Sequence, residues 1–210
     1  MLKLFPPTAC AITPETGKLG NATGRYEKRL SDLGGLYRDE DAFRSLAATQ
    51  GDRVVYAVEE FRPVETAGDL IFGVTYMQPG QVAGEYFMTR GHIHKTANRP
   101  EIYQGLSGEG LMLMESPQGE TRVVEIRPNT VCYVPPFWIH RSVNTGSGEL
   151  VMFFCYPSDS GQDYDIIARS GGMHSRIYAD DTGGWVEREN DLYRQRTQVE
   201  IEAVTQSAAV

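Results

Sequence analysis

The four histidines of this 210-residue chain point to possible metal chemistry, because three of them lie beside strand-like runs. His92 and His94 are two residues apart, and on an extended strand this spacing places both imidazoles on one face. Glu101 follows just before another strand-like run, and His140 comes after the run Tyr-Val-Pro-Pro. Neutral ring nitrogens with one carboxylate suit Fe, Mn, Ni, Co or Zn and leave coordination positions open for a substrate.

The separate parts of this pattern are weak signals, and their joint spacing is what favours a site. A His-x-His pair often arises by chance, and a glutamate before a strand is usually only solvated. Here His-x-His is followed by six residues, Glu101, six residues and Gly108, and later by Pro135-x-x-x-x-His140 with Asn144 four residues further on. This order resembles the two motifs of the cupin family. His174 has no such neighbours, and we interpret it as an ordinary loop residue.

Three positions depart from the usual cupin motifs, which place glycine where Tyr86, Asn129 and Phe137 stand. Asparagine tolerates a left-handed backbone, so the turn at Asn129 can survive. Phenylalanine at 137 is the larger change. We interpret these departures as marks of a specialised subfamily.

Many short strand-like runs, separated by turn-forming residues, predict an all-β protein. The runs cover residues 54–58, 70–77, 85–89, 102–103, 110–114, 122–126, 130–134 and 150–156. Their near-regular spacing is typical of an antiparallel sandwich or barrel. With the motifs above, it predicts one cupin domain over residues 1–210, a double-stranded β-helix or jelly-roll barrel with its core at about residues 50–160.

The segments outside this core predict short helical and strand extensions. Residues 40–48 favour one short helix, residues 163–200 favour a helix or edge strands over the barrel end, and residues 204–210 should be frayed.

Composition excludes some classes of partner. The chain has 20 basic and 28 acidic residues, a net charge of −8, which repels a nucleic-acid backbone but does not exclude a small phosphorylated ligand. No stretch approaches the roughly 20 apolar residues that span a bilayer. Cys10, Cys132 and Cys155 do not fit a disulfide framework, so we expect reduced thiols in a cytoplasmic protein, with the latter two as small core residues.

Longer segments narrow the comparison to one group of cupins. Residues 89–94 (TRGHIH), 100–103 (PEIY) and 133–144 (YVPPFWIHRSVN) resemble the cupin-type glucose-6-phosphate isomerases of archaea and some bacteria. So do residues 29–33 (RLSDL) and residues 156–164, which contain Tyr-Pro and Gly-Gln-Asp-Tyr. The resemblance runs from about residue 25 to about residue 190.

The resemblance implies a homodimeric metal enzyme that interconverts glucose 6-phosphate and fructose 6-phosphate. The family's metal ligands fall on His92, His94, Glu101 and His140, and Fe(II) is the metal we expect, with Mn, Ni or Zn as alternatives. Its phosphate- and sugar-contacting positions fall on Tyr56, Thr75, Thr89, Gly91, Tyr103, Tyr156 and Tyr164. Gln162 stands where well-known archaeal members have histidine; an amide cannot titrate, but it can hydrogen-bond a sugar hydroxyl.

For such a reaction we expect Glu101 to act both as metal ligand and as the base that moves a proton between C1 and C2 through a cis-enediol. The Thr75 and Thr89 hydroxyls and the Gly91 amide would hold the phosphate without a lysine. A direct hydride shift between C1 and C2 is the rival mechanism. Two other functions stay open on the sequence alone: an oxygen-using iron cupin and a non-catalytic sugar-binding cupin.

Overall fold

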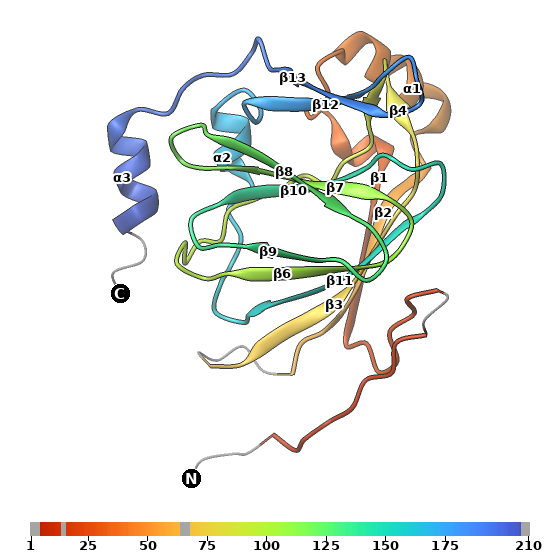
Figure 1. The fold of residues 1–210 in the computed structure, drawn as a ribbon, viewed down its shortest axis with the longest axis vertical. Coiled ribbons are helices and arrows are strands. Elements are labelled where there is room, and N and C mark those ends of the chain that lie inside the picture. The colour runs from red at the N-terminus through yellow and green to blue at the C-terminus, as the bar shows by residue number, and fades with distance from the viewer. Residues whose placement is uncertain (1–4, 14–15, 64–67, 207–210) are drawn as a thin grey trace.

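The computed structural model describes residues 5–13, 16–63 and 68–206 and consists mainly of strands (Figure 1). The strands are β1 (Gly24–Arg29), β2 (Val54–Phe61), β3 (Leu70–Met77), β4 (Gln81–Val82), β5 (Glu85–Tyr86), β6 (Glu101–Ser107), β7 (Gly110–Glu115), β8 (Thr121–Ile126), β9 (Val131–Val134), β10 (Ile139–Asn144), β11 (Leu150–Pro157), β12 (Ser175–Ala179) and β13 (Trp185–Glu189). The helices are η1 (Leu30–Leu33, a 3-10 turn), α1 (Glu40–Gln50), α2 (Asp165–Arg169) and α3 (Gln198–Gln206).

The strands form three antiparallel sheets. Six strands pair in the order β1-β2-β3-β11-β6-β9, three in the order β10-β7-β8, and four in the order β13-β12-β5-β4. Figure 1 shows the six-stranded and three-stranded sheets as two layers. Side chains of β2, β6, β7, β10 and β11 belong to a single buried cluster between them. This is the barrel of a cupin fold, and the all-β prediction is confirmed.

The burial of each strand follows its residue pattern. β7 is an unbroken apolar run (Leu111–Met114), and every residue of it is buried because it lies between β10 and β8. β9 lies at the edge of the six-stranded sheet and alternates, with Cys132 and Val134 inward and Val131 and Tyr133 exposed. An alternation of apolar and polar residues therefore marks a strand with one solvent-exposed face, and a continuous apolar run marks a strand in the middle of a sheet.

Most of the predicted elements are present with small boundary changes. The eight predicted runs all overlap strands, although the run at residues 85–89 forms a regular strand only over Glu85–Tyr86. The predicted helix at residues 40–48 is α1, which begins where the Asp39 side chain accepts a hydrogen bond from the Ala42 amide. The fraying predicted from residue 204 is wrong for residues 204–206, which continue α3; the rest of that segment lies outside the described residues.

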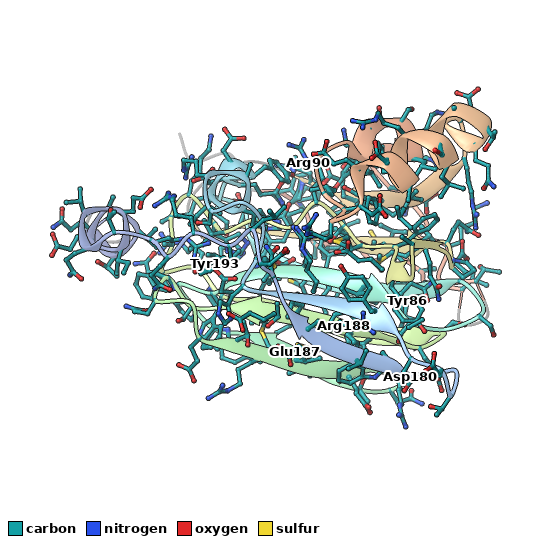
Figure 2. All side chains as sticks on the ribbon, turned by 90° about the horizontal axis from the view of Figure 1, so that it is seen from above. Tyr86, Arg90, Asp180, Glu187, Arg188 and Tyr193 are labelled. Atoms are coloured by element: carbon teal, nitrogen blue, oxygen red, sulfur yellow. The ribbon has the colours of Figure 1, made fainter. Side chains whose placement is uncertain are left out.

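The C-terminal extension covers one end of the barrel, as predicted. The β12–β13 hairpin adds to β5, and Figure 2 shows it from above, with Glu187 and Arg188 on β13 and Asp180 at its turn. Tyr86, which stands where the cupin motif usually has glycine, is buried and donates a hydrogen bond from its hydroxyl to the Gly184 carbonyl. This departure from the motif therefore anchors the hairpin to the barrel.

The other two departures keep the backbone that glycine would adopt. Asn129 has φ +67° and Phe137 has φ +71°, both in the left-handed region. Asparagine enters this region readily, whereas phenylalanine does so at a cost of about 1–2 kcal/mol. The Phe137 amide donates to the Ala97 carbonyl at 2.7 Å, and its ring packs on the core, which offsets that cost.

The three cysteines are unpaired, with Cys132 buried as predicted and Cys155 half-buried. Among the helices of the described residues, none is long and apolar enough to cross a membrane.

Candidate metal centre and active-site cavity

Four side chains from three parts of the chain meet inside the barrel. His92 and His94 lie on a short extended segment. This segment is joined to β10 by an isolated bridge at His140 and to a loop by a second bridge at Asp163, whereas the sequence favoured a regular strand. Glu101 is the first residue of β6, and His140 is the second residue of β10. Their possible ligand atoms all lie within 4.8 Å of one another, so this cluster could hold one metal ion.

The glutamate lies at the centre of the cluster. Glu101 Oε2 is 3.0 Å from His140 Nε2, 3.3 Å from His94 Nε2 and 3.9 Å from His92 Nε2. The side chain of Glu101 is 2% exposed, so these contacts form in a nearly dry environment. The structure therefore brings together the four residues that the sequence predicted as ligands, at distances that their spacing alone could not give.

The His94 and His140 rings are each oriented by a hydrogen bond at Nδ1, the ring nitrogen that points away from the cluster. His94 Nδ1 is 2.8 Å from the Arg99 carbonyl oxygen, and His140 Nδ1 is 3.1 Å from the Trp138 carbonyl oxygen. Because a carbonyl oxygen can only accept, each Nδ1 carries a proton, and each Nε2 faces the cluster. The Asp159 carboxylate holds the Arg99 side chain through contacts of 2.9 and 2.7 Å, which braces the loop.

The donor set fits a divalent metal ion. The Nε2 atoms of His92 and His94 are buried and have no hydrogen-bond partner among the described residues. Leaving such atoms unpaired is costly, and coordination would satisfy both of them. Three neutral nitrogens and one carboxylate suit several first-row metals, so the donor set does not identify the metal.

Electrostatics keep Glu101 and His92 in the ionisation states that ligands need. Burial raises the pKa of the Glu101 carboxyl, but the adjacent rings of His140 and His94 outweigh this effect, so this pKa lies below its ordinary value. Burial, reinforced by His140, lowers the pKa of His92 well below its ordinary value. At neutral pH Glu101 is an anion and His92 is neutral.

A cavity of about 420 Å³ opens beside His92 and Glu101. Its lining includes every position that the resemblance assigned to substrate contacts, namely Tyr56, Thr75, Thr89, Gly91, Tyr103, Tyr156, Gln162 and Tyr164. These residues come from four strands and two loops spread over about half the chain. The tertiary structure thus brings the predicted set together around one space, next to the possible metal ligands.

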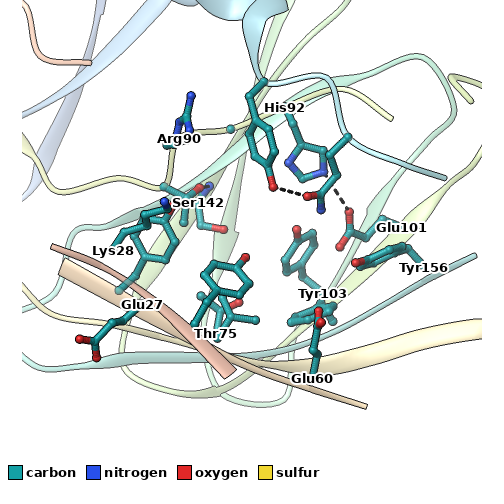
Figure 3. Close-up of a pocket in the computed structure, with 18 of the residues that line it drawn as sticks. Glu27, Lys28, Glu60, Thr75, Arg90, His92, Glu101, Tyr103, Ser142 and Tyr156 are labelled. Atoms are coloured by element: carbon teal, nitrogen blue, oxygen red, sulfur yellow. Dashed lines mark hydrogen bonds and ion pairs between the residues drawn. The ribbon is translucent and has the colours of Figure 1, made fainter. Parts of the chain in front are cut away.

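The cavity also has charged residues that the sequence analysis missed. Lys28, Arg90, Glu60 and Arg62 line it, and Arg90 lies over the Tyr164 ring at 5.0 Å. Figure 3 shows Lys28, Arg90 and Ser142 on one side of the space, with Glu101 and Tyr156 on the other. The expectation that the phosphate is held without a lysine stays a prediction, but Lys28 lies within the same cavity lining. Arg90 lies between Thr89 and Gly91, two positions already assigned to phosphate contacts, and this position in the sequence could have identified it as a cavity residue.

Gln162 has a defined role in the cavity wall. Its side-chain carbonyl oxygen accepts a hydrogen bond from the Tyr164 hydroxyl. The amide N–H groups of Gln162 are then the part of the side chain left to bind a ligand. A hydrogen bond from Gln162 to a sugar hydroxyl stays a prediction.

His174 lies apart from this cluster, as expected for a loop residue. Its backbone N–H donates to Glu115 Oε2 at 2.5 Å, and its ring packs edge-on against Tyr193 at 4.9 Å. It helps to hold the C-terminal segment and takes no part in the cavity.

Comparison with known proteins gives the family. The profile of the family described as glucose-6-phosphate isomerase (GPI) matches residues 27–194, which include the whole cluster and all of the cavity lining except Tyr26. The chain belongs to the glucose-6-phosphate isomerase family. The family and the enzyme class predicted from the motifs are thereby confirmed.

The similarity to individual members of the family extends over nearly the whole chain. A glucose-6-phosphate isomerase of Sinorhizobium medicae (strain WSM419) is 58% identical over 97% of this chain and 95% of that protein. The glucose-6-phosphate isomerase of Thermococcus litoralis is 40% identical over 92% of this chain and 100% of that protein. Among solved structures, a recombinant oxalate oxidase in complex with glycolate gives a TM-score of 0.46 at 17% identity, covering 56% of this chain and 59% of that chain.

Proposed function

We propose that the chain interconverts glucose 6-phosphate and fructose 6-phosphate in the cavity beside His92 and Glu101. The main support is that two members of the cluster able to hold a metal, His92 and Glu101, border the same 420 Å³ space as all eight predicted contact residues. One side of this space carries Lys28 and Arg90, which suit a phosphate, and the other carries Glu101. A phosphosugar would then lie with its phosphate near the cations and with C1 and C2 near the cluster.

The chemistry moves hydrogen between C1 and C2 while negative charge develops on O1 or O2. A divalent metal, when bound by the three histidines and Glu101, supplies Lewis acidity that stabilises such charge. Glu101 is the carboxylate that lies within the cluster and also lines the cavity. We assign it to remove the proton at C2 of glucose 6-phosphate and return it at C1, through a cis-enediol.

The phosphate would be held by neutral donors as well as by the two cations. Thr89 Oγ1 accepts a hydrogen bond from the Ser142 amide at 3.0 Å, which leaves the hydroxyl proton of Thr89 free to donate to a ligand. The Thr75 hydroxyl also lines this part of the cavity (Figure 3). Iron as the bound metal, a homodimer and a cytoplasmic location stay predictions from the sequence resemblance.

The deciding experiment is conversion of fructose 6-phosphate to glucose 6-phosphate before and after EDTA, with Fe, Mn, Ni and Zn restored one at a time. We expect activity to fall with EDTA and return with at least one metal. Absence of isomerisation with all four metals would overturn the proposed reaction. Full activity in metal-free protein would overturn its metal dependence.

Replacing Thr89 with valine should weaken substrate binding more than turnover. Hydrogen bonds to charged groups are worth about 1.5–3 kcal/mol, so we expect a KM for fructose 6-phosphate about 10- to 100-fold higher. Thr89→Ser keeps the hydroxyl and serves as the matched control, with a KM close to that of the wild type. An unchanged KM in Thr89→Val would remove Thr89 from the phosphate site.

A further inference from the structure

The backbone between the cavity and β10 forms a short arch. Met88 is bridged to Val143 and His92 to His140, so the three residues 89–91 face only two residues of β10, Arg141 and Ser142. The Thr89 N–H still donates to the Ser142 carbonyl at 2.9 Å, so the arch is a one-residue bulge at Arg90 and Gly91. Gly91 has φ +72°, and a Cβ there would lie 2.9 Å from the His140 carbonyl oxygen. Only glycine fits this position, so the arch has one defined shape.

Arg141 fills the underside of this arch. Its side chain projects from β10, is buried (5% exposed), and donates from Nη2 to the Arg90 carbonyl oxygen at 2.9 Å. Its Nη1 contacts Met88 Sδ at 2.7 Å. One guanidinium group therefore holds both ends of the Met88–Arg90 segment.

The charge of Arg141 has no carboxylate partner among the described residues. The nearby acids are already paired: Glu85 with Arg176 at 2.8 Å and Glu115 with Arg196 at 2.5 Å. Arg141 Nε is buried without a hydrogen-bond partner. Burial, followed by the charge of Arg176, lowers the pKa of Arg141 to about 10, which still leaves it protonated at neutral pH. An unpaired buried charge is costly and calls for a compensating anion.

The bond to Arg90 also sets the direction of the next amide. In a trans peptide the C=O and N–H groups point to opposite sides of the chain. Because Arg141 holds the Arg90 carbonyl on the buried side, the Gly91 N–H is turned the other way. Gly91 lines the cavity, and no described residue accepts a hydrogen bond from its N–H.

We propose that Arg141 is a positioning residue for the substrate phosphate. It fixes the Arg90–Gly91 peptide with the N–H directed to the phosphate, and its buried positive charge is balanced when the phosphate dianion binds above the arch. This inference rests on the proposed function. Three successive residues of β10 would then serve both ends of the substrate. His140 would bind the metal, Arg141 would hold the arch, and the Ser142 amide would orient the Thr89 hydroxyl.

The test compares two variants. Arg141→Gln keeps an N–H donor but loses the charge, and Arg141→Lys keeps the charge but loses the planar guanidinium group. The readouts are KM and kcat for fructose 6-phosphate, competitive inhibition by inorganic phosphate, and bound metal. For Arg141→Gln we expect KM and the phosphate inhibition constant to rise together by about 10-fold or more, with bound metal unchanged and kcat within about threefold. Arg141→Lys should recover part of the loss.

The control is Arg194→Gln, which removes an arginine away from the cavity, where it pairs with Glu200 at 2.7 Å. It should leave KM and phosphate inhibition unchanged. If Arg141→Gln changes only kcat or bound metal, the residue supports His140 and the inference is overturned. Failure of both Arg141 variants to fold would assign the residue to the fold alone and would also overturn it.

Direct binding of inorganic phosphate to the wild type, by calorimetry, separates this inference from the proposed function. Phosphate binding that Arg141→Gln weakens, in a protein without isomerase activity, would overturn the reaction and retain the role of Arg141. Isomerase activity with unchanged phosphate binding in both variants would retain the reaction and overturn the role of Arg141.

Discussion

Replacing His140 with alanine is expected to abolish metal binding and isomerisation together. His140 Nε2 is 3.0 Å from Glu101 Oε2, and its Nδ1 is held by the Trp138 carbonyl, so the ring has a fixed place in the cluster, which alanine leaves empty. Loss of a residue that only orients a ligand typically costs 10- to 100-fold in metal affinity, so loss of the ligand itself should cost more than about 100-fold. Metal analysis after loading with Fe(II), together with turnover of fructose 6-phosphate, measures both.

The matched control is His174→Ala, because His174 is the one histidine outside the cluster and packs on Tyr193 instead. It should bind metal and turn over substrate like the wild type. Retention of a full equivalent of tightly bound metal by His140→Ala would exclude His140 as a ligand. His92→Ala is expected to behave like His140→Ala, since its buried Nε2 has no other described partner.

Replacing Glu101 with glutamine is expected to reduce turnover far more than metal content. The amide keeps the shape of the side chain and one oxygen donor, but it cannot accept a proton at neutral pH. Removal of a general base typically costs about 10²–10⁴-fold in rate, and we expect kcat to fall in that range. If Glu101→Gln with bound metal turns over at the wild-type rate, Glu101 is not the base.

Deuterium at C2 of glucose 6-phosphate tests the same assignment in the wild-type protein. Proton transfer by Glu101 through an enediol exposes the label to exchange, so we expect part of it to appear in water. Complete retention would favour a direct hydride shift between C1 and C2. Glu60→Gln is the matched variant for this measurement: Glu60 lines the same cavity but is paired with Arg62 at 3.1 Å, so exchange should persist.

Strands with apolar patterns could be predicted from the sequence, and strands with polar patterns could not. β3 and β11 read as Val, Ile, Leu and aromatic runs, and both were predicted nearly to the residue. β10 was missed because its sequence, Ile-His-Arg-Ser-Val-Asn, resembles an exposed segment, although all six of its residues are buried. Its polar side chains are satisfied by partners distant in the sequence, such as the Met77 carbonyl for Asn144. Such partners cannot be read from local pattern.

β1 is also polar in sequence and was also missed, although it lies at an edge of the sheet rather than in the interior. Its sequence, Gly-Arg-Tyr-Glu-Lys-Arg, contains no alternation of apolar residues, because it is an edge strand that contributes to the wall of a polar cavity. It forms by pairing with β2, with Lys28 opposite Tyr56. Lys28 therefore reaches the cavity only through this pairing.

The sequence by itself determined which residue types are available to the candidate site: three histidines and a glutamate at fixed spacing, and the predicted contact residues that the family resemblance supplied. Ligand type and spacing along the chain are local properties, so they can be read without coordinates. The tertiary structure alone decided which charges face the same space and which lie behind it. Arg90 and Arg141 are both arginines beside a motif residue, yet Arg90 lines the cavity while Arg141 is buried beneath it. Burial and distance set the effect of a charge, and both depend on segments far apart in the chain.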